Sequence, residues 1–289
     1  MISRMKKART RSALLLLLCA LGCAPGETGS VRDDLSRSVA IPPKVTRVVT
    51  LAPNLTEIVY AIGAGNRIAG TDDFSDEPAA AKTLPKVGGM QPNVEKIVAL
   101  KPDLVLATTN GNHPNLAPAL AAVHIPLYVV RTDRLDEIPR AMERIATLLK
   151  LPSAAAGELR AAIARQKRTR SRAPRVLFAV WANPLYVAGR KTFSDDLFEL
   201  TGATNAVPVD GWPQYSLESL VAQPPDIILY PSKPVSRAQI DKLLDVSPDL
   251  KRRVSVIAVD ENLFTRPGPR VALAAQELNR ILDAWRPSR

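Results

Sequence analysis

The chain has 289 residues, 46% of them hydrophobic and 23% charged, so it can bury a substantial core, and its length suggests roughly two domains. This composition argues against intrinsic disorder beyond the N-terminus. Five basic residues and no acidic ones lie within residues 1–22, so without that segment 34 basic residues face 28 acidic ones and the net charge falls from +11 to +6. The cluster at 165–172 favours a solvated helix face over a nucleic-acid or lipid surface.

The N-terminus has the pattern of an export signal. Its basic residues precede an apolar stretch, 13–21, that is too short to span a bilayer as a mature helix. The stretch ends in Ala20-Leu21-Gly22-Cys23, which resembles the lipidation site of bacterial lipoproteins. We therefore predict a signal peptide over 1–22, lipidation of Cys23 and a flexible tether over 23–43. Simple cleavage at a nearby site is the alternative.

Residues 44–152 are predicted to form an N-terminal lobe. Apolar runs that predict buried strands alternate with segments of helical periodicity, the strands at 45–51, 67–70, 103–108 and 126–130 and the longest helices at 54–62 and 135–150. This alternation predicts a mainly parallel sheet covered on both faces. Asn54, followed by Glu57, suggests a capping box at the first helix. Gly63-Ala64-Gly65 closes that helix, which argues against a dinucleotide-binding turn.

Residues 153–173 are rich in alanine, with Leu159 and Ile163 spaced as a narrow apolar stripe. We predict one long rigid helix of about 27 Å that joins the lobes and limits their closure. The C-terminal lobe then spans 174–289, with strands at 175–180 and 254–259 and helices at 193–201, capped by Ser194, and at 236–244 and 269–285. The expected fold class is α/β, with two Rossmann-like lobes joined by this helix.

One short unit occurs twice, at 93–106 and 216–229. In each copy a polar cap, Asn93 or Ser216, begins a short helix with a carboxylate in its first turn, and a Pro-Asp pair then leads into a buried strand. The offset of 123 residues is far longer than the period of a solenoid, about 20 to 50 residues. The repeat predicts two similar lobes, with a ligand in the cleft outside the carboxyl ends of their strands.

Catalytic signatures are sparse. The sequence has no phosphate-binding loop with lysine and no nucleophile elbow. Of its two histidines, His124 is expected in a turn, and His113, in a loop after a strand, contacts either ligand or solvent. Two histidines without cysteine make a poor metal site. We predict a protein that is not an enzyme and has no cofactor or metal; an exported α/β enzyme that uses Asp or Glu with a metal is the alternative.

The predicted loops and strand ends carry aromatic side chains: Phe74, Trp181, Tyr186, Trp212 and Phe264. Rings in such places suit a large, flat, partly apolar ligand. The alternative is that they fill the lobe cores. Flanking Gly211 and Pro213 favour exposure of Trp212, whereas both interpretations stay open for Trp181 and Tyr186.

Over about residues 45–285 the sequence resembles the class III periplasmic binding proteins, which serve ABC importers of cobalamin, haem and ferric siderophores, and among them the cobalamin-binding members. The likeness is densest at 50–57, in both repeated units, at Trp212-Pro213-Gln214 and at 264–270. It implies cobalamin or a related corrinoid as the transported ligand, an ABC permease and its ATPase as partners, and a monomer in the periplasm or on the outer face of the membrane.

The resemblance also implies roles for individual residues. Glu95 and Glu218 match acids, one on each lobe, that dock onto arginines of the permease; the alternative is that each complements its helix dipole, a contribution of about 0.3 to 1 kcal/mol. The implied ligand-binding set is Phe74, Met90, Trp181, Tyr186, Trp212, Phe264 and Arg266.

Two positions in this set depart from the cobalamin-binding members. The stretch Gly88-Gly89-Met90-Gln91 stands where such a member can carry another tryptophan, and Trp181 stands where a glycine can occur, so we expect a reshaped pocket. A ferric siderophore or haem is the alternative ligand. A siderophore would require several cations, for which the sequence offers Arg266 and Arg190.

Overall fold

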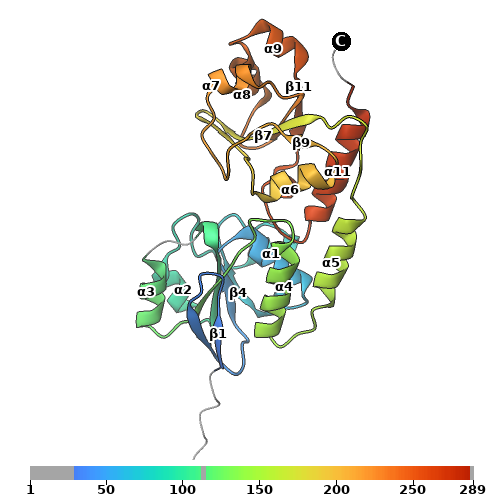
Figure 1. Cartoon of the computed structure of the whole chain (residues 1–289). Coiled ribbons are helices and arrows are strands. Elements are labelled where there is room, and N and C mark those ends of the chain that lie inside the picture. Colours follow the sequence, from blue (N-terminus) through green and yellow to red (C-terminus); the bar gives the residue numbers. More distant parts are fainter. Residues whose placement is uncertain (1–28, 112–114, 287–289) are drawn as a thin grey trace, which may run out of the picture.

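The computed structural model describes residues 29–111 and 115–286 (Figure 1). The predicted signal peptide, Cys23 and His113 lie outside these residues. The chain forms two lobes, one above the other in Figure 1, each with a sheet flanked by helices. The α/β class with two mainly parallel lobes is confirmed. No helix within these residues is both long enough and apolar enough to cross a membrane.

The N-terminal lobe contains a parallel sheet in the order β4-β3-β5-β6. Its strands are β3 (Val48–Thr50), β4 (Ile68–Thr71), β5 (Leu104–Thr108) and β6 (Leu127–Val130). Its helices are α1 (Pro53–Ala61), α2 (Val94–Ala99), α3 (Leu116–Ala122) and α4 (Glu137–Leu148), with 3-10 turns at Gly65–Arg67, Ala79–Thr83 and Thr109–Gly111. Val48 packs with α1 and α4, and its neighbour Val49 packs with α2 and α3, because successive strand residues face opposite sides.

The C-terminal lobe has the sheet order β11-β10-β7-β8, with β9 paired to β7. Its strands are β7 (Arg175–Ala182), β8 (Leu185–Val187), β9 (Thr204–Asn205), β10 (Ile227–Pro231) and β11 (Ser255–Val259), of which β8 runs antiparallel to β7. Its helices are α6 (Phe193–Leu200), α7 (Leu217–Ala222), α8 (Arg237–Leu244), α9 (Pro248–Arg253), α10 (Glu261–Phe264) and α11 (Val271–Ala284). One buried cluster contains residues of both lobes, so their interface belongs to a shared core.

The predicted long helix is wrong in length. Helix α5 covers only Ala154–Ala164, or about 16 Å. The basic residues that follow would repel one another at helical spacing. Instead, Arg168 N donates to Leu200 O at 2.9 Å, and Arg170 donates to Thr201 O at 2.8 Å and to Asp283 at 2.7 Å. These contacts fasten the segment to the ends of α6 and α11, so the connection is held by packing.

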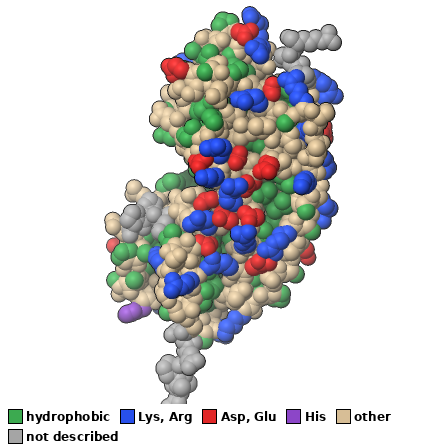
Figure 2. All heavy atoms as spheres, in the orientation of Figure 1, with side chains coloured by type: hydrophobic (Ala, Val, Ile, Leu, Met, Phe, Trp, Pro, Cys, Tyr) green, Lys and Arg blue, Asp and Glu red, His purple; other side chains and the backbone are tan. Residues whose placement is uncertain are grey.

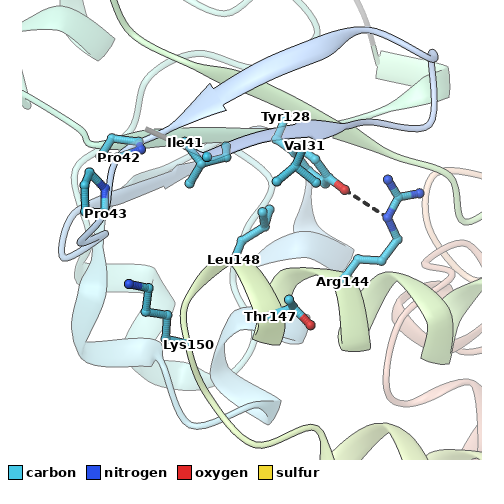
Figure 3. A pocket seen from close by; sticks show the side chains of 10 residues that line it. Val31, Ile41, Pro42, Pro43, Tyr128, Arg144, Thr147, Leu148 and Lys150 are labelled. Atoms are coloured by element: carbon cyan, nitrogen blue, oxygen red, sulfur yellow. Dashed lines mark hydrogen bonds between the residues drawn. The ribbon is translucent and has the colours of Figure 1, made fainter. Parts of the chain in front are cut away.

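The predicted tether is wrong from Gly29 onward. β1 (Gly29–Arg32) and β2 (Ser38–Ile41) form an antiparallel hairpin. Along β2 buried and exposed residues alternate, with Val39 and Ile41 buried. Its turn is tied to the edge of the sheet, because Asp34 N donates to Val129 O at 3.0 Å. Figure 3 shows the hairpin over α4, where Arg144 Nε donates to Tyr128 Oη at 2.9 Å. Covering an edge strand in this way protects it from pairing with another chain.

The helix caps divide into two groups. Asn93 and Ser216 cap α2 and α7 as predicted, each accepting a bond from the backbone N–H three residues later. The cap of α1 is Ala52, followed by Pro53 in the first turn, so the predicted Asn54–Glu57 capping box is wrong. Thr192, and not Ser194, caps α6.

Candidate functional site

A cavity of about 490 Å³ lies between the lobes at the carboxyl ends of their strands. Thr108 ends β5, and Thr132 follows β6, on the N-terminal side. Val180 approaches from β7 on the other side. The outline of the molecule narrows between the two lobes in Figure 2. The cavity therefore occupies the place that the strand order favours for a ligand.

The two walls of this cavity differ in chemistry. The N-terminal lobe contributes polar side chains, namely Asn54, Thr108, Asn110, Thr132 and Asp133. The C-terminal lobe contributes Val180, Phe193, Trp212, Thr265 and Pro267. The ring centroids of Phe193 and Trp212 lie 6.1 Å apart at an interplanar angle of 49°, a tilted aromatic pair that supports Trp212. A ligand in the cavity would therefore meet hydrogen-bonding groups on one side and an aromatic surface on the other.

All seven predicted ligand residues lie in the described part of the chain, and among them only Trp212 lines this cavity. Phe74, Met90, Trp181 and Tyr186 are all exposed. Trp181 and Tyr186 lie opposite each other on β7 and β8, and Tyr186 also pairs with Gln214 near Trp212. The exposed rings of the C-terminal lobe thus come from neighbouring segments.

Phe74 lies on the N-terminal lobe against the segment that carries Met90. A Cβ atom added to Gly89 would be only 3.0 Å from the Phe74 ring, so glycine at 89 allows this close contact.

Phe264 contradicts the prediction that it stacks on a ligand. Its side chain is 2% exposed and its ring lies 6.1 Å from that of Phe178, inside the shared core. Asp260 caps α10 by accepting a bond from Asn262 N at 2.7 Å, and this short helix directs Phe264 inward. Phe264 therefore fills the core, which is the alternative that the sequence left open.

Arg266 lies at a contact between the lobes. Its guanidinium is 2.6 Å from the Asp76 carboxylate and 3.6 Å from that of Glu57, and it donates to Phe74 O at 3.3 Å. Burial alone would raise the pKa of Asp76, but the hydrogen bond and the charge of Arg266 together outweigh it and lower that pKa. The carboxylate is therefore ionised at neutral pH, and Arg266 is neutralised by the opposite lobe.

Two more sets of polar contacts join the lobes. Arg270 donates from Nε and Nη2 to the two oxygens of Glu57, at 2.9 and 2.7 Å. Arg134 bonds to Asp196, with its Nε 2.9 Å from the carboxylate, and Leu135 N donates to the same group at 2.8 Å. Figure 2 shows basic and acidic side chains intermixed in the region between the two lobes. Glu57 and Arg270 were missed because 213 residues separate them.

A buried hydroxyl network supports the loop that carries Phe74. Thr56 Oγ1 lies 2.6 Å from Thr50 Oγ1 and 2.7 Å from Ser75 Oγ, and Ser75 donates to Asp72. Phe74 N donates to Asp72 at 3.0 Å. Burial raises the pKa of Asp72, although these hydrogen bonds oppose the shift. The loop backbone is therefore fixed while the Phe74 ring stays exposed.

Glu95 and Glu218 are both exposed on the first turns of α2 and α7. Neither has an ion-pair partner within 4.0 Å among residues 29–111 and 115–286. Hydrogen bonds from its own backbone N–H and from Ser216 lower the pKa of Glu218. In Figure 1 both helices lie on the left of the molecule, with α5 and α11 on the right.

The polar wall of the cavity was not predicted. Its members lie at or just after the ends of buried strands, except Asn54, which belongs to α1. The sequence pattern identifies the former only as strand ends and Asn54 only as a helix cap. A search that weighted polar residues after strands as heavily as aromatic ones would have found Asn110 and Asp133.

Comparisons with known proteins give a consistent result. The family model for periplasmic binding proteins matches residues 48–246. The vitamin B12-binding protein of Pectobacterium carotovorum subsp. carotovorum is 34% identical over 252 residues, which covers 83% of this chain and 90% of that protein.

Solved structures show the same architecture. The periplasmic vitamin B12 binding protein BtuF of Vibrio cholerae has a TM-score of 0.64 and 26% identity, covering 83% of this chain and 97% of that one. The periplasmic heme-binding protein RhuT from Roseiflexus sp. RS-1, in its apo form, has a TM-score of 0.72 and 25% identity, covering 82% and 97%. Backbone similarity therefore does not distinguish vitamin B12-binding proteins from heme-binding proteins, and this distinction has to come from the side chains.

Proposed function

The chain belongs to the periplasmic binding protein family, and on this premise we propose that it captures cobalamin or a related corrinoid between its lobes and delivers it to the permease of an ABC importer. The observation that carries this proposal is the cavity with two unlike walls. A corrinoid is a flat macrocycle with polar amides around its edge. The exposed Trp212, supported by the buried Phe193, offers a stacking surface, and the opposite wall offers hydrogen-bonding groups.

The exposed aromatic residues support a ligand larger than the cavity. Ligand sites typically enclose about 300 to 1,000 Å³ and are lined mostly by apolar and aromatic groups. A corrinoid that filled the cavity would extend beyond it, toward Tyr186 and Trp181 on one lobe and Phe74 and Met90 on the other. These four residues, with Trp212, are the stacking residues of the proposal.

The cations weigh against a ferric siderophore. Arg266 is paired with Asp76, and Arg190 lies 3.2 Å from Asp210, so each candidate cation already has an acidic partner. In the described part of the chain, the residues that line the cavity include no Lys or Arg. An anionic chelate would meet little positive charge there.

Incubation with cyanocobalamin followed by gel filtration tests the proposal. We expect the corrinoid absorption to elute with the protein in a ratio near one to one. Protein that retains haemin or a ferric siderophore but no corrinoid would overturn the assignment. Haemin and an anionic ferric catecholate siderophore, applied in parallel, distinguish this outcome from an inactive preparation.

Glu95 and Glu218 are proposed to dock onto basic residues of the permease. Two observations support this role. Each glutamate is exposed and has no salt bridge among the described residues, and the two occupy equivalent positions in the two lobes. A permease with two-fold symmetry would need one such acid per lobe. Because neither carboxylate has an ion-pair partner within the described residues, both are available for an intermolecular ion pair.

Export and anchoring are further parts of the proposal. The basic and apolar N-terminal pattern supports removal of residues 1–22 and lipidation of Cys23. Multiple acyl chains would then hold a monomer at the outer face of the membrane, since one chain binds only marginally. Its role there is binding and delivery without catalysis.

A further inference from the structure

Asp133 places a carboxylate in the wall of the inter-lobe cavity. It follows β6, and its two partners, Thr109 and Asn110, follow the adjacent parallel strand β5. Thr109 Oγ1 donates to Asp133 Oδ2 at 3.3 Å, and Asn110 Nδ2 donates to Oδ1 at 2.5 Å. The strand order brings these loops together, and the two neutral donors orient the carboxylate.

The charge of Asp133 has no partner of opposite sign. No Lys, Arg or His nitrogen among the described residues lies within 4.0 Å of it. Arg134, the next residue in the chain, is bound to Asp196 instead. Among the residues that line the cavity, Asp133 alone carries a formal charge in the part of the chain that the structure describes. The cavity is therefore weakly anionic.

The carboxylate also has unused capacity to accept hydrogen bonds. An ionised carboxylate offers about four acceptor sites, and Thr109 and Asn110 occupy two of them. The remaining sites require donors. A ligand with N–H groups at its edge can supply them, whereas a ligand with carboxylates at its edge adds like charge in a partly buried place.

We propose that Asp133 selects the edge chemistry of the ligand: it accepts hydrogen bonds from primary amides and rejects ligands that carry carboxylates in the same place. This inference rests on the proposed corrinoid function and deepens it. Corrinoids with intact side chains carry amides, whereas haem carries propionates. The same residue thus favours one class and disfavours the other, which is how specificity is commonly achieved.

The test compares two ligands with the same ring. Dicyanocobinamide carries amides, and dicyanocobyrinic acid carries carboxylates in their place. Titration calorimetry on the mature chain should show a preference for cobinamide. Asp133→Asn should weaken that preference by roughly tenfold, mainly through tighter binding of the acid, because a like charge is removed. The change should also increase affinity for haemin.

Two further variants control the experiment. Asp133→Glu keeps the charge and should keep rejecting the acid, even if its longer side chain lowers affinity for the amide. Asp245→Asn removes the same charge from an exposed pair with Lys251 and should leave the preference unchanged. Circular dichroism and thermal melting check that each variant is folded.

The outcomes separate the two proposals. If the wild-type chain binds cyanocobalamin and folded Asp133→Asn keeps the wild-type preference, this inference is wrong and the corrinoid function stands. Loss of acid rejection in Asp133→Glu as well would also contradict it, because the charge is retained. If the wild-type chain binds neither cyanocobalamin nor dicyanocobinamide, both proposals fail.

Discussion

The two lobes share one helix-turn-strand unit but present unlike surfaces to the cleft. In both, a six-residue helix with a side-chain cap carries an exposed glutamate, and an Asp at the following turn binds the backbone at the start of a neighbouring strand. In the N-terminal lobe, residues after the unit's strand form part of the polar wall. In the C-terminal lobe, Trp212, in the loop before the unit, forms part of the apolar wall. The comparison indicates that the repeated unit preserves the scaffold and the two exposed glutamates, whereas the loops around the cavity differ between the lobes.

The largest expected effect concerns the positions that the lobes share. Glu95→Ala and Glu218→Ala should each weaken the complex with the permease by about ten- to a hundredfold, and the double variant by about a thousandfold, because each removes one of the two proposed charge pairs. Binding to reconstituted permease and vitamin uptake into proteoliposomes measure this. Equal single effects would support equivalent lobes, and unequal effects would break the comparison.

Glu158→Ala is the matched control for these variants. Glu158 is an exposed acid on α5, on the opposite side of the molecule in Figure 1, and its removal should leave transport unchanged. Corrinoid affinity should stay at the wild-type value in every docking variant. Weakened ligand binding in Glu95→Ala or Glu218→Ala would refute the docking role.

The next effect concerns the ion pair between Glu57 and Arg270, one of the contacts that join the lobes. Glu57→Ala should lower the free energy of unfolding by about 3 kcal/mol, because it leaves the partly buried Arg270 without its bidentate partner. Urea denaturation measures the loss. Glu143→Ala breaks an exposed ion pair with Arg160 and should cost less than about 1 kcal/mol. A similar loss in both variants would show that burial of the Glu57 pair is unimportant.

A third prediction tests the apolar wall. Trp212→Ala should weaken cyanocobalamin binding by about 2 kcal/mol, or roughly thirtyfold, because it removes a large ring from the cavity. Val209→Ala, at an exposed apolar residue outside the cavity lining, is the control and should bind normally. Calorimetry measures both. Unchanged affinity in Trp212→Ala would mean that the ligand does not contact this wall.

Local patterns in the sequence predicted those structural features that depend only on residues near one another in the chain. The order of most strands and helices and the caps at Asn93 and Ser216 follow from periodicity and from backbone groups within one turn. The extent of α5 did not, since Arg170 gains its partners from Thr201 and Asp283, far along the chain. Periodicity predicts that a helix can form, but distant contacts decide where it ends.

The site was less predictable than the fold for the same reason. Phe264 has the sequence context of a loop residue, yet a short capped helix turns it against Phe178. Asn54 and Glu57 have the spacing of a capping box, yet they bind Pro267 and Arg270 on the other lobe. Polar residues that work across an interface resemble local caps until the partner surface is known.

The smallest expected effect is a difference in stability between variants of Asp103 and Asp226, the aspartates of the two Pro-Asp turns. Asp103 accepts bonds from Thr46 N, Thr46 Oγ1 and Arg47 N at 2.6, 2.9 and 2.9 Å. Asp226 accepts one from Arg175 N at 2.8 Å and a longer one from Arg172 at 3.4 Å. Asp103→Asn should therefore lower the free energy of unfolding by about 1 kcal/mol, and Asp226→Asn by less.

The pH dependence of this effect has a definite sign. Burial acts to raise the pKa of Asp103, but its hydrogen bonds outweigh burial and lower that pKa below its unfolded value of about 3.9. The stabilisation is therefore complete above that value and is lost as the pH falls through the folded pKa. Urea denaturation between about pH 7 and pH 3 should show wild type and Asp103→Asn converging on acidification. A constant difference across this range would mean that the ionised carboxylate of Asp103 does not stabilise the start of β3.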